Sequence, residues 1–176
     1  MKLTNLVFAS LIFVAAFSSC KKDSDTTPPG EEIDPAITAR AEEMKAFIVD
    51  KKFQIRDFYS DKPIDYNEED ADTAKKTQLF EYTSPWIKDD KNTFDPATGK
   101  VTIEQGPNKI AGNSDELIVK DYSIVAEKDD VYFNFLDDDY LALKYHLVSF
   151  TDSTFLVYTD YLEGSKVYTK FGIINE

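Results

Sequence analysis

The C-terminal half of the chain consists of short segments that alternate apolar and polar residues and are separated by brief turns. The turns carry Asp, Lys, Ser and Gly, as in KDD at 128–130, DDD at 137–139 and EGS at 163–165. Short strands that follow one another through short turns indicate an antiparallel meander. The strands predicted from this pattern cover residues 116–125, 131–135, 141–150, 154–159 and 166–174.

The first half of the chain adds further strand candidates. In DPATGK, Pro96 suits position i+1 of a type I turn, and Gly99 suits the left-handed position that closes a hairpin with a bulge. We therefore predict a hairpin of residues 92–94 and 101–104. About eight strands can close into an up-and-down barrel, which removes the exposed edges of a sheet. Two more strands, the second of them weaker, are predicted at residues 52–59 and 78–82.

One amphipathic helix is predicted before the strands. Asp34 and Pro35 suit the N-cap and the first helical position. Apolar residues then recur at helical spacing from Ile37 to Ile48, and charged residues fill the other face. We expect a helix over residues 35–49 that covers one end or one edge of the sheet. The predicted fold class is therefore all-β with one N-terminal helix.

The N-terminus has the pattern of a lipoprotein signal peptide. Lys2 precedes an apolar run at residues 6–17, which is shorter than the roughly 20 residues of a membrane-spanning helix. Small residues then lead to Cys20, the single cysteine of the chain. This order predicts a signal peptide over residues 1–19 and a lipid anchor on Cys20. A polar, Pro-containing tether follows to residue 33, and the barrel domain would span residues 34–176.

The charge of the chain narrows the range of partners. Residues 1–19 hold one Lys and no acidic residue, so their removal changes the formal charge from −13 to −14. Nucleic-acid binding relies on basic patches that neutralise phosphates, and this composition argues against it. The same charge argues against electrostatic docking on anionic lipid headgroups. The remaining length suits one domain, which we expect to be a monomer.

Three stretches resemble the lipocalin-like lipoproteins of Bacteroidota. SPWIKDDKNTFDPATGKVTIEQG (84–106) is similar to their central hairpin, and YHLVSFTDSTFLVY (145–158) to their late hairpin. KKFQIRDFY (51–59) stands where that family has its first strand, with Phe53 in place of a usual Trp. The resemblance covers residues 51–174 and implies a lipocalin-like barrel. Together with Lys21 and the acidic residues soon after Cys20, it implies an anchor in the outer membrane or at the cell surface.

The residue inventory is poor in catalytic groups. His146 is the single histidine, which excludes the usual zinc and Cys/His sites, and no GxSxG motif supports a Ser-His-Asp triad. We interpret His146 as a strand residue of the barrel wall or rim, and we expect no enzyme and no cofactor. The acidic groups at 137–139 and 89–90 suit either calcium or a solvated turn, and we favour the turn. Trp86 suits sugar stacking or packing, and we favour packing.

Two functions remain open. The first is the binding of a small apolar ligand inside the barrel, with the acidic loop at 60–76 as a candidate lid. The second is a surface module that binds a glycan or a partner protein through exposed aromatics such as Tyr158, Tyr161 and Tyr168. A cavity inside the barrel would favour the first. The candidate interior and ligand-binding residues are Ile103, Phe133, Leu143, Leu147, Phe155, Val157 and Phe171, with Ile118 as a further interior position.

Overall fold

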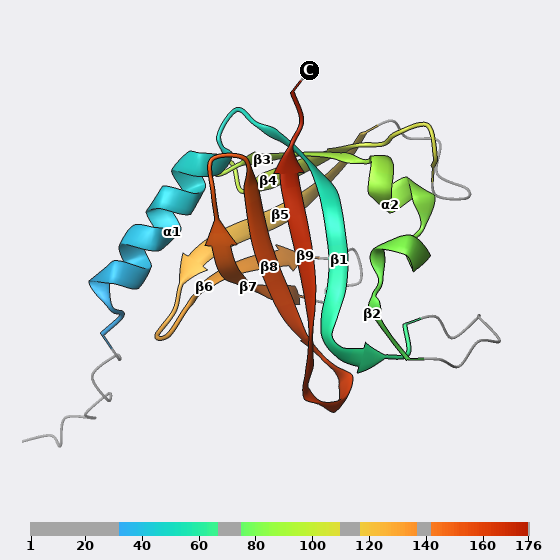
Figure 1. The fold of residues 1–176 in the computed structure, drawn as a ribbon. Coiled ribbons are helices and arrows are strands. Elements are labelled where there is room, and N and C mark those ends of the chain that lie inside the picture. The colour runs from blue at the N-terminus through green and yellow to red at the C-terminus, as the bar shows by residue number, and fades with distance from the viewer. Residues whose placement is uncertain (1–31, 67–74, 110–116, 137–141, 176) are drawn as a thin grey trace, which may run out of the picture. The chain divides into compact units, whose positions relative to one another are not determined.

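The computed structural model describes residues 32–66, 75–109, 117–136 and 142–175 (Figure 1). The predicted signal peptide, Cys20 and most of the tether lie outside these ranges. The same holds for the acidic group at 137–139 and for residues 67–74 of the predicted acidic loop.

Helix α1 (Pro35–Ile48) begins as the sequence predicts. The Asp34 carboxylate accepts a hydrogen bond of 2.8 Å from the backbone N–H of Ala36, and Pro35 occupies the first turn. Proline is tolerated there because the first helical N–H groups have no partner within the helix. The helix buries Ala41, Met44 and Ile48 against the strands. The predicted amphipathic helix is thus confirmed, and it ends one residue earlier than expected.

The strands form a closed antiparallel barrel (Figure 1). From β3 to β9, strands that are consecutive in sequence pair with each other, and β1 pairs with both β9 and β3, so that eight strands close the ring. The short strand β2 pairs with the C-terminal part of β1. This confirms the predicted all-β meander with one N-terminal helix. The strands are β1 (Lys52–Ile64), β2 (Lys76–Gln78), β3 (Lys91–Asp95), β4 (Lys100–Glu104), β5 (Leu117–Ala126), β6 (Val131–Leu136), β7 (Ala142–Phe150), β8 (Thr154–Tyr161) and β9 (Ser165–Ile173).

The segment between β2 and β3 differs from the prediction. The strand expected at 78–82 is wrong, because β2 ends at Gln78 and a 3₁₀ turn follows at Phe80–Tyr82. A short helix, α2 (Pro85–Asp89), comes next and was not expected. Pro85 presets the backbone angle of a first helical turn, which favours this outcome. The acidic loop expected from residue 60 also begins later, because β1 continues to Ile64.

Helix α2 lies beside β1, where the pairing between β1 and β3 is short. The β1–β3 ladder contains only the pairs Lys52–Thr93 and Phe53–Asn92. Further along the same edge of β1, the Leu79 N–H donates to the Phe58 carbonyl at 2.9 Å, and β2 then pairs with β1 from Tyr59 onward. Helix α2 packs against β1 in this region. Helix α2 therefore takes the place of a neighbouring strand along the part of β1 that lies between its pairing with β3 and its pairing with β2.

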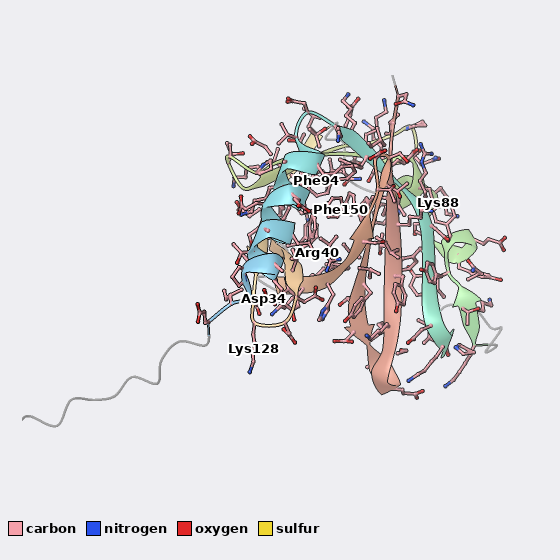
Figure 2. All side chains as sticks on the ribbon, turned by 60° about the vertical axis from the view of Figure 1, so that its left-hand side comes forward. Asp34, Arg40, Lys88, Phe94, Lys128 and Phe150 are labelled. Carbon is pink, nitrogen blue, oxygen red and sulfur yellow. The ribbon has the colours of Figure 1, made fainter. Side chains whose placement is uncertain are left out.

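Two apolar clusters occupy different levels of the barrel interior. The larger one contains Phe53, Phe94, Phe133 and Phe155 and is covered by α1. Arg40 of α1 ties the helix to β7, since its Nη2 donates to the carbonyls of two residues at a register shift, Leu147 and Val148. Figure 2 shows Arg40 and Phe150 on this side, with Lys88 of α2 across the barrel. The smaller cluster contains Ile64, Leu79 and Val167, with Phe58 and Tyr66 packed against it.

The described core lies within residues 37–173. A chain that begins at Lys21 therefore keeps all of it.

Candidate functional site

A cavity of about 420 Å³ lies inside the barrel between the two apolar clusters. The inward face of β9 passes all three levels: Ile173 packs against the larger cluster, Thr169 and Phe171 line the cavity, and Val167 belongs to the smaller cluster. The interior is thus filled at two levels and hollow between them. The lining residues are Ile55, Phe58, Tyr66, Thr83, Trp86, Ile87, Ile103, Lys120, Phe135, Leu143, Tyr145, Val157, Thr169 and Phe171.

The structure places the seven candidate ligand-binding residues in the cavity wall, in the core or, for Val157, in both. Four of the seven candidate ligand-binding residues line the cavity, namely Ile103, Leu143, Val157 and Phe171. The other three, Phe133, Leu147 and Phe155, face inward but belong to the larger cluster, where at most 1% of each side chain is exposed. Ile118 pairs with Ile103 across β4 and β5 and does not line the cavity. Alternation along a strand indicates which residues point inward, but not which level is hollow.

The short helix α2 contributes a wall that sequence reasoning missed. Trp86 and Ile87 line the cavity from α2, and Thr83 lines it from the preceding turn. The Thr83 hydroxyl donates to the Leu79 carbonyl at 3.0 Å, which fixes the entry into this segment. Trp86 is half-buried and faces the hollow interior, which supports the packed interpretation over an exposed sugar-stacking residue.

The carboxylates at the C-terminal end of α2 bind the chain beyond β4. Asp89 accepts hydrogen bonds from the backbone N–H and the side-chain amide of Asn108, at 3.0 and 2.6 Å. Asp90 accepts one from the Gly106 N–H at 3.2 Å. Burial raises the pKa of Asp90 above its ordinary value, the Gly106 hydrogen bond opposes this, and the charge of Asp89 adds to it. These acids therefore anchor α2 to the end of β4.

No group of three or more His, Cys, Asp or Glu side chains in the described ranges has the geometry to hold a metal ion. In the same ranges, no helix is both long enough and apolar enough to cross a membrane.

The polarity of the cavity is uneven. Its wall is mostly apolar and aromatic, with hydroxyl groups from Tyr66, Tyr145 and Thr169. Burial raises the pKa of Tyr145, and neighbouring Tyr66 adds to the shift, so the Tyr145 phenol stays neutral at ordinary pH. Among the lining residues that the structure describes, Lys120 of β5 is the one with a formal charge. An apolar cavity with a few convergent polar groups is the usual form of a small-molecule site.

The outer face carries a second feature, a row of aromatic rings that crosses five strands. Tyr132, His146, Tyr158, Tyr168 and Tyr59 are cross-strand neighbours, with ring centroids 4.3–5.5 Å apart. In two of these contacts the ring planes are parallel to within 5°. In these two contacts, Tyr59 on Tyr168 and His146 on Tyr158, the rings turn their faces toward each other, whereas the other two contacts are tilted. We call these five side chains the outer aromatic row.

His146 belongs to this row and not to the cavity. Its Nδ1 lies 3.0 Å from Asp130 Oδ2, and its ring stacks on Tyr158 with the centroids 4.3 Å apart. Asp130 also lies 3.7 Å from Arg40 Nη1, which connects the histidine to α1. The placement agrees with the predicted barrel wall position, and the contacts within the described residues are those of a structural histidine.

No family model matches the chain, and no curated protein matches it. The cavity and the outer aromatic row are therefore the features that bear on its function.

Proposed function

We propose that the protein is a lipid-anchored binding protein that holds a small apolar ligand inside its barrel and catalyses no reaction. Cys20 carries the anchor, which attaches the barrel to the outer membrane or the cell surface. The observation that supports the ligand is the cavity between the two apolar clusters. Its volume of about 420 Å³ lies in the range of roughly 300–1,000 Å³ that is typical of small-molecule pockets.

The cavity wall favours an apolar ligand for an energetic reason. Of the fourteen lining residues within the described part of the chain, six are aromatic, and most of the others are aliphatic. Burial of apolar surface contributes roughly 25 cal/mol per Å² removed from water, so a ligand that fills the cavity gains on its own surface and on that of the wall. A rigid barrel also needs little ordering on binding, which lowers the cost of association.

The direct test is mass spectrometry under native conditions. The chain from Lys21 to Glu176 is incubated with a total lipid and metabolite extract, separated from excess extract and weighed. We expect a discrete added mass that is lost on denaturation, and this mass identifies the ligand class. The bare mass of the protein after every extract would count against the proposal.

A matched pair of variants assigns the ligand to the cavity. Val157 lines the cavity and is 2% exposed, so Val157→Phe fills part of the hollow. Val119 of β5 is 58% exposed on the outer face, and Val119→Phe makes the same change outside the barrel. We expect the first variant to lose the added mass and the second to keep it. Equal retention in both would place the ligand elsewhere.

The outer aromatic row supports a second candidate function, the binding of a glycan or a partner protein. Tyr158 and Tyr168 belong to the row, while Tyr161 is 39% exposed near the end of β8. The test is retention of the protein on immobilised envelope glycans, compared with Tyr158→Ala. The cavity remains the stronger candidate, because stacking within the row covers the ring faces that a sugar would use.

A further inference from the structure

Four of the described residues that line the cavity carry a hydroxyl group, and these hydroxyls differ in their hydrogen bonds. The Thr83 hydroxyl donates to the Leu79 carbonyl at 3.0 Å. The hydroxyls of Tyr66, Tyr145 and Thr169 have no hydrogen-bond partner among the described residues. Because a buried hydroxyl group usually has a partner, these three are the groups of the wall that a ligand can satisfy.

The strand register directs two of these residues into the interior. Tyr145 of β7 lies two positions before Leu147, which is 1% exposed in the packed core. Thr169 of β9 lies between Phe58 of β1 and Val157 of β8 in the two ladders, and it is 7% exposed. A valine at this position would avoid the cost of burying a hydroxyl group. The hydroxyl of Thr169 is therefore a polar group at a position that packing alone does not require to be polar.

Aromatic contacts hold the two phenols at the cavity wall. The Tyr145 ring meets Phe135 with the centroids 5.6 Å apart and the planes at 88°, and the Tyr66 ring meets Phe58 edge to face at 5.3 Å. The two tyrosines come from β7 and from the segment that follows β1, and both line the same cavity. A neutral phenol donates one hydrogen bond, so two donors from separate parts of the chain border one apolar space.

The wall favours a neutral hydrogen-bond acceptor over other ligand classes. A pure hydrocarbon would expel water from the three hydroxyls and return no hydrogen bond, which lowers affinity. An anion would be buried without a free cation, since Lys120 already interacts with another group of the protein. A cation would lack a counter-charge, because none of the lining residues in the described ranges is acidic.

We infer that the cavity takes an apolar molecule that carries one neutral carbonyl group, as in a ketone, ester or amide, and that the Tyr145 hydroxyl donates to its oxygen. This inference rests on the proposed function, since it names the class of ligand for the same cavity. Tyr66 and Thr169 supply further donors along the wall. Trp86 is the single tryptophan of the chain and lines the cavity, so its emission reports on occupancy.

The test uses three compounds with the same nonyl chain. 2-Undecanone carries a carbonyl group, 2-methyl-1-undecene has a methylene group in place of its oxygen, and decanoate has a charged oxygen in place of its methyl group. Each competes with N-phenyl-1-naphthylamine bound to the chain that begins at Lys21, and binding is followed by probe emission and by Trp86 emission. At pH 7 we expect decanoate to bind more weakly than 2-undecanone.

A matched pair of variants assigns the hydrogen bond to one side chain. Tyr145→Phe removes only a hydroxyl group, so it should weaken the binding of 2-undecanone about tenfold, the scale of one hydrogen bond, and leave that of the alkene unchanged. Tyr161→Phe removes a hydroxyl from a tyrosine that is 39% exposed near the end of β8, and it should change neither affinity. The infrared carbonyl stretch of the bound ketone should lie at lower frequency in the wild type than in Tyr145→Phe.

Thermal unfolding separates a ligand contact from a structural one. Tyr145→Phe should be as stable as the wild type in the absence of ligand, because the hydroxyl has no partner among the described residues. A loss of stability would give the hydroxyl a structural role and would overturn the inference.

The binding outcomes separate this inference from the proposal beneath it. If Tyr145→Phe weakens the ketone and the alkene alike, or weakens neither, or if decanoate binds more tightly than 2-undecanone, the cavity binds apolar molecules but the inference is wrong. If neither the probe nor any of the three compounds changes the emission of Trp86, the proposed function fails and the inference fails with it.

Discussion

Replacement of Phe155 tests the division of the barrel into filled and hollow levels. Phe155 is 1% exposed, and its ring lies 4.5 Å from Phe171, 5.1 Å from Phe53 and 5.6 Å from Phe133, measured between centroids. Truncation of a buried Phe to Ala costs about 3–5 kcal/mol, because the transfer energy and the cavity left behind add together. We expect Phe155→Ala to lose about 4 kcal/mol of the free energy of unfolding.

Phe171 is the matched control. It has the same size, lies opposite Phe155 in the β8–β9 ladder and stacks on it, but its other side borders the cavity. A side chain that borders a hollow space has fewer packing partners to lose. We expect Phe171→Ala to cost about 2 kcal/mol, near the value for incomplete burial of an aromatic ring.

Urea unfolding followed by Trp86 emission and circular dichroism measures both variants. With a slope of about 2 kcal/mol per molar urea, the midpoint should fall by about 2 M for Phe155→Ala and about 1 M for Phe171→Ala. Phe155→Leu keeps most of the volume and should lose less than about 1.5 kcal/mol, which provides a folded reference. Equal losses for the two Ala variants, or a loss below 1.5 kcal/mol for Phe155→Ala, would refute the division into filled and hollow levels.

Four further changes give predictions of different sign. Tyr122 buries a hydroxyl group that has no hydrogen-bond partner in the described residues, so Tyr122→Phe should raise the free energy of unfolding by about 1 kcal/mol, and a loss in urea unfolding would contradict this. Arg40→Met leaves the carbonyls at the β7 register shift without a donor and should cost about 1–2 kcal/mol in the same assay, whereas no loss would contradict it. Burial raises the pKa of Asp90, so the folded protein holds this proton to higher pH than the unfolded chain, and its stability falls as pH rises from 3.8 through the raised value. Asp90→Asn should therefore be more stable than the wild type at pH 7 and equal to it well below pH 3.8. Asp95→Asn should show the opposite pattern in thermal melts, with lower stability than the wild type at pH 7 and equal stability at low pH. Hydrogen bonds to Asp95, first among them the one from the Thr98 hydroxyl, lower its pKa. The stabilisation that they provide is therefore lost as the pH falls through that lowered value.

The sequence predicted those parts of the fold that depend on local periodicity and turn chemistry. Gly99 has a φ of +66° at the hairpin turn, where a left-handed residue was expected, and the five C-terminal strands are found within one or two residues of their predicted ends. The segment from Lys76 to Asp89 was misjudged, because three apolar or aromatic residues in five suit a strand as well as a short helical turn. There the tertiary contacts of Leu79 and the fixed geometry of Pro85 decide the outcome.

The candidate site could be predicted only in part. Alternation identifies an inward position such as Val157, but the position of the hollow level depends on the volumes that all the strands contribute at that height. Lys120 shares the inward parity of Ile118 and Tyr122, so its orientation was open to sequence reasoning. The sequence could not predict that Lys120 lies inside an apolar cavity, since half of the lining residues belong to strands distant in sequence and to α2.

The two helices have opposite consequences for the barrel. Helix α1 adds Met44 and Ile48 to the larger cluster and thereby completes a densely packed end. Helix α2 instead replaces strand pairing along β1 and presents Trp86 and Ile87 to the hollow level. A wall held by a few contacts at its ends, such as Leu79 to Phe58 and Asp90 to Gly106, opens at a lower free-energy cost than a continuous ladder. Helix α1 therefore adds to the packed core, whereas α2 forms part of the wall of the cavity.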